Sequence, residues 1–180
     1  MTYEETITYL YNSAPLFQNV GGDAYKEGLE TTQTLDKHFG HPHRKFRTIH
    51  VAGTNGKGSV TAYLTAVLVS AMKKVGTFNS PSVFEYNERF LLNGSPLRGG
   101  LVAKYFTIVR DTIEREQARR RDENLPPFTP TAFEIETAAA LLCFKEEGCE
   151  IVILETGLGG RWDATNAVEN KLLSIITTIG

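Results

Sequence analysis

The sequence has few cysteines, no excess of one charge and no long hydrophobic run, and each absence excludes a class of protein. Its two cysteines, Cys143 and Cys149, match neither a C-x-x-C redox motif nor a zinc knuckle, so we expect reduced thiols. The 19 Lys and Arg residues nearly balance 21 Asp and Glu, which disfavours nucleic acid as the main partner. No stretch reaches the roughly 18 apolar residues of a membrane span, and no signal peptide is visible. We therefore expect a cytoplasmic protein with neither nucleic-acid nor membrane partners.

Helix-like and strand-like segments alternate along the 180 residues, and this order predicts an α/β fold. The strands are continuous apolar runs, which is typical of a mostly parallel sheet covered by helices on both faces. We expect strands at 47–52, 75–78, 149–154 and 172–177, helices at 2–13, 29–39 and 60–72, a helix from 101 into the charges of 114–123, and a helix that Thr131 and Glu134 cap.

The expected elements divide the chain into a helical lead-in, residues 1–46, and a phosphate-loop α/β core, residues 47–180. Residues 79–100 are rich in Ser, Pro, Asn and Gly and are expected to form a long loop. The chain ends at Gly180 directly after a predicted strand, where a connection to a helix should begin. We therefore expect a truncated core with few strands.

A glycine-rich loop, residues 53–59 with the sequence GTNGKGS, lies between the 47–52 strand and a helix. In this setting backbone N–H groups and the helix N-terminus can hold phosphate. Lys57 supplies a positive charge for β- and γ-phosphate oxygens, and the Ser59 hydroxyl can face Mg²⁺. The spacing differs from the dinucleotide pattern G-x-G-x-x-G, so dinucleotide binding is disfavoured. A glycine turn that only joins strand to helix would explain neither Lys57 nor Ser59.

Glu155 closes the apolar run 151–154, at the strand end where open α/β sheets bind ligands. A carboxylate there can hold Mg²⁺ while the ion bridges nucleotide phosphates, so we expect Glu155 to be a metal ligand. A solvent-exposed strand-end glutamate is the alternative. Residues 156–166, TGLGGRWDATN, follow at once, and a plain turn would not need three glycines before an Arg, an aromatic residue and an Asp.

Four other polar residues invite functional interpretations. Arg89 could pair with a substrate carboxylate, although solvent or a surface ion pair is favoured for a lone loop arginine. His41 and His43 have the spacing of metal ligands, but without a third ligand nearby an ordinary polar loop is favoured. His50, inside the 47–52 strand, is interpreted as a hydrogen-bonded strand residue rather than a catalyst.

Together these motifs resemble the folylpolyglutamate synthase/dihydrofolate synthase family, within the Mur-ligase-like ATP-dependent amide ligases. The first motif, residues 50–59, is shared with the wider Mur-ligase group, whereas ETGLGGRWDATN narrows the resemblance to the folate branch. The resemblance is carried by 50–59, Ser80-Pro81, Asn87-Glu88-Arg89, Phe133-Glu134 and 155–166.

The resemblance implies that ATP phosphorylates a folate or dihydropteroate carboxylate, and that the amine of L-glutamate then attacks the acyl phosphate. It implies catalytic roles for Lys57 and Glu155, and Mg²⁺ ligation by Ser59, Ser80 and Glu155. It further implies a nucleotide site of Thr54, Asn55, Gly56, Lys57, Gly58 and Ser59, and substrate contacts from Gly28, Arg89, Phe133, Trp162, Asp163 and Ala164.

The chain departs from the family pattern in two ways. The family loop usually reads Ser-Pro-His-Leu, whereas Ser82 and Val83 follow Pro81 here. The second-metal histidine, the carbamylated lysine and the C-terminal glutamate-ligase domain of the family fall beyond Gly180. The resemblance thus implies that this chain alone is inactive and that the full-length protein is a monomer.

Two rival functions and the choice of substrate stay open at the level of sequence. A generic P-loop NTPase or kinase, or a nucleotide-binding module without chemistry, would share the phosphate loop and the acidic strand end. Neither has a reason for residues 155–166, which favour the ligase. Whether the enzyme uses dihydropteroate, reduced folates or both is not decided by these motifs.

Overall fold

The computed structural model describes residues 1–13, 28–169 and 171–180. Within these residues, six strands form one sheet in the spatial order β4-β3-β2-β5-β1-β6. Strands β2, β5, β1 and β6 are parallel to one another, whereas β3 pairs antiparallel with both β2 and β4. This topology confirms the predicted α/β fold with a mostly parallel sheet. The strands are β1 (Arg47–Ala52), β2 (Val75–Phe78), β3 (Phe90–Leu92), β4 (Ser95–Pro96), β5 (Ile151–Glu155) and β6 (Leu173–Ile176).

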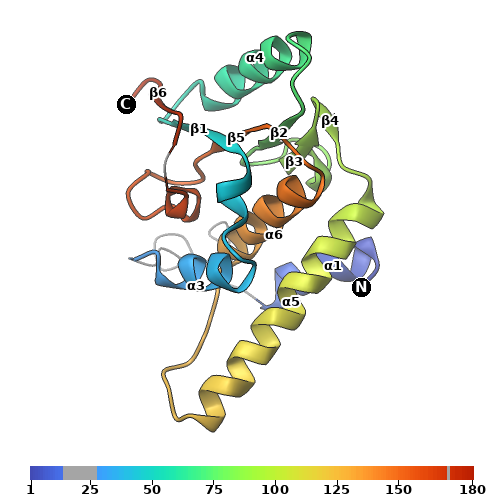
Figure 1. Ribbon diagram of the computed structural model, residues 1–180, viewed down its shortest axis with the longest axis vertical. Helices are drawn as coiled ribbons and strands as arrows, with labels where there is room; N and C mark the ends of the chain where they lie inside the picture. The colour runs from blue at the N-terminus through green and yellow to red at the C-terminus, as the bar shows by residue number, and fades with distance from the viewer. Residues whose placement is uncertain (14–27, 170) are drawn as a thin grey trace.

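Helices lie on both faces of the sheet (Figure 1). On one face, apolar side chains of α4 pack with Ile49, Val51 and Ile153. On the other face, Val152 and Leu154 join the larger core that α5 and α6 form. The alternation along β5 therefore gives each face its own apolar layer. The described helices are α1 (Tyr3–Ser13), α3 (Glu30–His38), α4 (Lys57–Ser70), α5 (Gly99–Asp122) and α6 (Ala132–Glu146), with 3-10 helices η2 (Pro42–Lys45), η3 (Tyr86–Arg89) and η4 (Ala164–Ala167).

The N-terminus of α6 has the predicted capping box. The Glu134 N–H donates to Thr131 Oγ1 at 3.2 Å, and the Thr131 N–H donates to Glu134 Oε2 at 2.8 Å. Both groups satisfy backbone donors that the first helical turn leaves unpaired. The helix that follows is buried along most of its length, so the box fixes the start of the central helix of the larger core.

The segment 79–100 is not the expected loop. It contains η3 and a short hairpin in which Leu92 pairs with Ser95 across Asn93 and Gly94. Both turn residues have positive φ, 51° and 78°, as a tight turn matched to strand twist requires. The Asn-Gly pair is a strong hairpin signal in the sequence, and the hairpin adds two antiparallel strands to the edge of the sheet.

The start of α4 and the burial of β6 also differ from expectation. Helix α4 begins at Lys57 rather than at residue 60, so the phosphate loop runs directly into the helix. Strand β6 pairs with β1, yet its Leu173 and Ile176 side chains are exposed, unlike the buried strand that the apolar run predicts. None of the described helices is both long and apolar enough to cross a bilayer.

Candidate nucleotide-binding site

The phosphate loop occupies the turn between β1 and α4, at the carboxyl edge of the parallel strands. Gly53 and Gly56 have φ values of 140° and 85°, which other residues adopt only with strain. A Cβ on Gly53 would also clash with the Thr177 side chain. Thr177 Oγ1 donates to the Asn55 carbonyl at 2.7 Å, and the Thr54 N–H donates to the Thr178 carbonyl at 2.7 Å. The segment after β6 therefore holds the loop in place.

Lys57 is the first residue of α4 and lies over the loop. Its Nζ donates to the Gly53 carbonyl at 2.8 Å and to the Thr54 carbonyl at 3.4 Å. Two backbone carbonyls of the loop therefore hold the ammonium group above the turn. Residues 54–56, Gly58 and Ser59 are exposed, so backbone N–H groups, an ammonium and a hydroxyl are open to a ligand.

Glu155 lies beside this loop because β5 is paired with β1 in a register that places Glu155 opposite Val51. The Glu155 side chain is only 5% exposed, and its Oε2 accepts a hydrogen bond from the Ser80 N–H at 3.3 Å. Burial raises the pKa of Glu155, and the Ser80 N–H and the Lys57 ammonium oppose that shift. The same Oε2 lies 3.9 Å from the place where a Cβ on Gly58 would stand. The fold thus brings Lys57, Gly58, Ser80 and Glu155 together.

This donor set fits Mg²⁺ bound with a nucleotide. Mg²⁺ is commonly held by one or two carboxylates and by substrate phosphates, and it keeps several waters. Here one buried carboxylate, Glu155, stands near the start of α4, which carries Ser59, and next to Ser80. The roles of Ser59 and Ser80 as ligands stay predictions.

The second glycine-rich segment, residues 156–166, is organised from inside by Asp163. The buried Asp163 carboxylate accepts hydrogen bonds from the N–H groups of Gly157 at 2.8 Å, Leu158 at 3.0 Å and Thr165 at 3.0 Å. The Thr165 hydroxyl also donates to it. Burial raises the pKa of Asp163, and these donors oppose the shift. Asp163 therefore fixes the shape of the loop, a function that the sequence motif did not reveal.

His50 is connected to the same carboxylate through Thr165. Its Nε2 lies 2.7 Å from Thr165 Oγ1, and because that hydroxyl donates to Asp163, the histidine Nε2–H is the donor. Burial, together with the Lys171 ammonium, lowers the pKa of His50 to about 4. His50 is thus a hydrogen-bonded strand residue, as predicted, and it supports the loop from a position 115 residues away in the sequence.

The aromatic candidates lie around this loop. The Phe133 ring stacks on Phe78 with centroids 5.6 Å apart, and a Cβ on Gly157 would stand 2.8 Å from the Phe133 ring. The half-buried Trp162 carries the Arg161 guanidinium 4.9 Å from its ring centroid. Gly157 is therefore required for the close approach of the loop to Phe133 on α6.

The other substrate candidates have different surroundings. Ala164 is 5% exposed and begins η4. Gly28, with φ of 109°, lies just before α3, where an added Cβ would clash with the Glu30 carboxylate. Neither arrangement assigns a ligand contact, so both residues stay predictions as substrate contacts.

Arg89 is neither in solvent nor in a surface ion pair. Its Nη1 donates to Glu136 Oε2 at 2.7 Å, and the side chains are 14% and 5% exposed. The Tyr86 hydroxyl donates to the other oxygen of Glu136 at 2.9 Å. Burial raises the pKa of Glu136, and Arg89 opposes that shift. The geometry gives Arg89 an internal partner, so it anchors η3 to α6.

The expectation that His41 and His43 lack a third potential ligand is wrong. The sequence shows no such group beside them, but the fold brings the Asp36 carboxylate to both imidazoles. The signal was present in the spacing, because Asp36 precedes His41 by five residues across the end of α3. The two cysteines, by contrast, are free, as predicted, and both are buried.

A glycine-rich loop between strand and helix, with a buried carboxylate at the same sheet edge, is the arrangement typical of nucleotide-binding α/β domains. No protein-family model matches the chain. The chain is 44% identical over 156 residues to the dihydrofolate synthase/folylpolyglutamate synthase of Bacillus subtilis (strain 168), across 86% of this chain and 35% of that protein.

Solved structures agree with that relationship. Folylpolyglutamate synthase from Thermotoga maritima matches with a TM-score of 0.82 and 38% identity, covering 99% of this chain and 38% of that one. E. coli FolC in complex with DHPP and ADP matches with a TM-score of 0.81 and 31% identity, covering 100% of this chain and 39% of that one. The chain is thus homologous to the N-terminal portion of the folylpolyglutamate synthase/dihydrofolate synthase family, as the motifs predict.

Proposed function

We propose that this chain is the nucleotide-binding part of an ATP-dependent ligase that joins L-glutamate to a folate or dihydropteroate carboxylate through an acyl phosphate. The observation that carries the proposal is the grouping of Lys57, Ser80 and Glu155 beside the phosphate loop. Two similar proteins support the proposal. The B. subtilis relative is named a dihydrofolate synthase/folylpolyglutamate synthase, and E. coli FolC has been solved in complex with DHPP and ADP.

In this proposal the loop binds the ATP phosphates. Backbone N–H groups at the start of α4 and the Lys57 ammonium face the β- and γ-phosphate oxygens, and they favour the charge that moves toward the leaving group. Glu155, with the hydroxyls of Ser59 and Ser80, holds Mg²⁺. When bound, the ion neutralises phosphate charge and orients the transferred group. Burial raises the pKa of Glu155, and the Ser80 N–H and the Lys57 ammonium oppose that shift and favour the ionised carboxylate.

The second glycine-rich segment contributes to substrate binding in this proposal. Phe133 and Trp162 offer aromatic surface for a pterin ring, and Ala164 lines the turn beside them. Asp163 acts through the loop: it holds the N–H groups of Gly157 and Leu158 and so sets where Trp162 stands. Arg89 acts in the same indirect manner by anchoring η3 against α6.

The chain spans 35% of the length of the B. subtilis relative. We propose that the glutamate site and further ATP contacts belong to a C-terminal domain in the family, outside these residues. Because positioning supplies much of the rate of such reactions, with effective molarities worth roughly 7 to 11 kcal/mol, this chain alone should show no turnover.

The test uses the natural protein that contains this chain. It is incubated with ATP, Mg²⁺, labelled glutamate and either dihydropteroate or tetrahydrofolate, and both phosphate release and labelled product are followed. The proposal predicts that phosphate release depends on glutamate and on one of the two acceptors. Phosphate release that ignores glutamate would favour a generic NTPase, and ATP binding without any release would favour a module without chemistry.

A further inference from the structure

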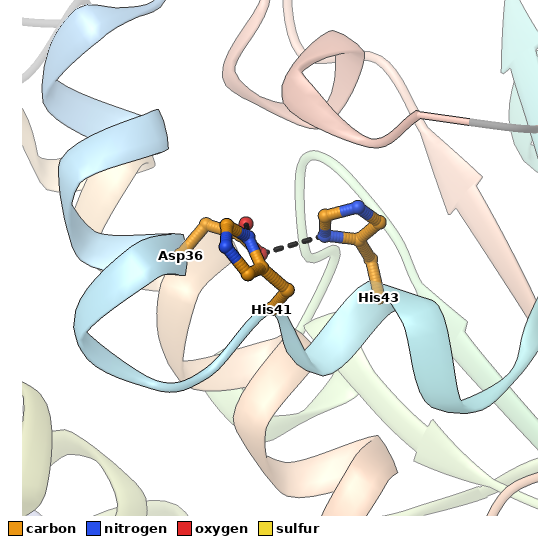
Figure 2. A group of neighbouring side chains, drawn as sticks. All are labelled: Asp36, His41 and His43. Atoms are coloured by element: carbon orange, nitrogen blue, oxygen red, sulfur yellow. Dashed lines mark hydrogen bonds and ion pairs between the residues drawn. The ribbon is translucent and has the colours of Figure 1, made fainter.

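A compact group of metal-ligating side chains lies at the end of α3, apart from the nucleotide site. Figure 2 shows Asp36, His41 and His43 converging from the helix, the following turn and η2. Asp36 Oδ2 lies 2.5 Å from His41 Nδ1, and Asp36 Oδ1 lies 2.7 Å from His43 Nδ1. Among the residues that the structure describes, this is the group of three or more His, Cys, Asp or Glu whose ligand atoms all lie within 4.8 Å of one another.

The backbone holds these side chains in place. The His41 N–H donates to the Asp36 carbonyl at 2.8 Å and the Gly40 N–H donates to the Lys37 carbonyl at 3.0 Å, which is the hydrogen-bond pattern of a Schellman motif. Gly40 and His41 have positive φ values of 67° and 55°. Pro42 then begins η2 and places His43 one residue further on. The three side chains therefore converge without a flexible connection between them.

A buried nitrogen without a partner distinguishes this group from an ordinary polar cluster. The hydrogen bond between His43 and Asp36 uses only Nδ1 of the imidazole, and the His43 side chain is 3% exposed. His43 Nε2 is buried, has no hydrogen-bond partner within the described part of the chain, and lies 4.0 Å from the Glu169 carboxylate. With the proton on Nδ1, an Nε2 lone pair faces that carboxylate, which is unfavourable.

We propose that Asp36, His41 and His43 bind Zn²⁺ or a chemically similar divalent transition-metal ion. The ion takes the place of the two Nδ1–H groups that now donate to Asp36, and the proton of each imidazole moves to its Nε2. The His43 proton then sits on Nε2, where it faces Glu169, and a carboxylate behind a ligating histidine is a common arrangement in zinc sites. Two imidazoles and one carboxylate form a donor set that suits Zn²⁺ better than Mg²⁺, because Mg²⁺ favours oxygen ligands.

The required change in geometry is confined to these side chains. Tetrahedral Zn²⁺ with bonds of about 2.0 to 2.1 Å separates its ligand atoms by about 3.3 Å. The two Asp36 contacts must therefore lengthen by less than about 1 Å. The ligand atoms, which all lie within 4.8 Å of one another, must come together to about that 3.3 Å separation, and side-chain rotation supplies both shifts. The group precedes β1, whereas the phosphate loop follows β1, so the two sites stand at opposite ends of that strand. The ion ties the end of α3 to η2 and, through Glu169, to the segment after η4, and this assignment does not depend on the proposed ligase function.

The experiment measures Co²⁺ and Zn²⁺ uptake by the purified chain after metal removal. We expect one Co²⁺ per chain with the visible absorption of a tetrahedral site, displacement by Zn²⁺, and a Zn²⁺-dependent rise in the melting temperature. Asp36→Asn and His43→Gln should weaken binding by about 100-fold or more, and Glu169→Gln by about 10-fold. His38→Gln is the matched control, because His38 lies on the same helix and pairs with Glu116 instead.

A second variant keeps the test decisive if the buried substitutions unfold the chain. The His41 side chain is 35% exposed, so His41→Gln should fold, as circular dichroism checks, and still lose the zinc-dependent rise in melting temperature. A folded wild-type chain that takes up neither ion at millimolar concentration would overturn the proposal. So would uptake that survives in His41→Gln, or sulfur-to-cobalt charge-transfer bands, which would assign the ion to Cys143 or Cys149.

Discussion

Two glycine-rich segments follow neighbouring parallel strands at one edge of the sheet, yet they are built in opposite ways. The loop after β1 exposes its polar groups, and backbone carbonyls position Lys57. The segment after β5 turns its carboxylate inward, where Asp163 accepts hydrogen bonds from its own loop. Similar composition therefore serves ligand binding in one segment and internal support in the other. Substitutions should separate the two, by activity in the first segment and by stability in the second.

The largest expected effect is the loss of the internal support. Asp163→Ala removes the acceptor of three backbone N–H groups and one hydroxyl. At about 1 to 1.5 kcal/mol for each of the four bonds, the free energy of unfolding should fall by about 4 to 6 kcal/mol in urea titration. The exposed Asp122→Ala is the control and should change it by less than about 0.5 kcal/mol. A small loss in Asp163→Ala would place the support of this segment elsewhere.

The exposed loop should show the reverse behaviour. Lys57→Ala removes a charge that the β/γ-phosphate oxygens need, so kcat/KM for ATP in the natural protein should fall by an amount equivalent to about 2 to 4 kcal/mol. The melting temperature should hardly change, because Lys57 contacts only carbonyls at the surface of the loop. Lys73→Ala removes a surface lysine paired with Glu150 and serves as the control. Near-normal ATP use by Lys57→Ala would contradict the assignment.

The stability that His50 contributes to the second glycine-rich segment should also depend on pH. Its pKa is lowered from 6.5 to about 4, so the unfolded chain binds the proton more readily than the folded one. The stability contributed by neutral His50 is complete above pH 6.5 and falls as the pH drops toward 4, by about 3 kcal/mol in all. Urea titrations of wild type and His50→Gln at several pH values isolate the contribution of His50 to the free energy of unfolding. If their difference does not change between pH 7 and 4, the prediction is wrong.

The smallest effect is expected outside both segments, at the cap of α6. Thr131→Ala leaves the Glu134 N–H without its side-chain partner and should lower the free energy of unfolding by about 1 kcal/mol. Thr131→Ser retains the oxygen and should restore most of that loss. Equal losses in both variants would show that the methyl group of Thr131, rather than its hydroxyl, is what stabilises the helix start.

The sequence predicted what local patterns determine. Strands 47–52 and 75–78 are apolar runs, and the structure has them at the same bounds. The capping box of α6 was readable because Thr131 and Glu134 are three residues apart. The β3–β4 hairpin was missed although Asn93-Gly94 signals it, because Ser, Pro and Gly around it are also typical of loops.

Contacts between distant residues could not be predicted in this way. His50 meets Thr165, and Arg89 meets Glu136, only after β1, η3 and α6 have packed around the sheet. Neither the inward orientation of Asp163 nor the approach of Asp36 to His43 follows from hydrophobic periodicity. The phosphate loop was different, because its residues are contiguous and its position follows from one strand and one helix.

We propose that Glu155 and the phosphate loop form one Mg²⁺-nucleotide site. The most direct measurement is calorimetric titration of a non-hydrolysable ATP analogue into the natural protein, with and without Mg²⁺, for wild type and Glu155→Gln. We expect Mg²⁺ to strengthen binding to wild type by at least about tenfold, as one charge-assisted contact of about 1.4 kcal/mol or more would. Glu155→Gln should lose this gain and keep its melting temperature. An equal Mg²⁺ effect in both proteins would show that Glu155 is not part of the Mg²⁺-nucleotide site.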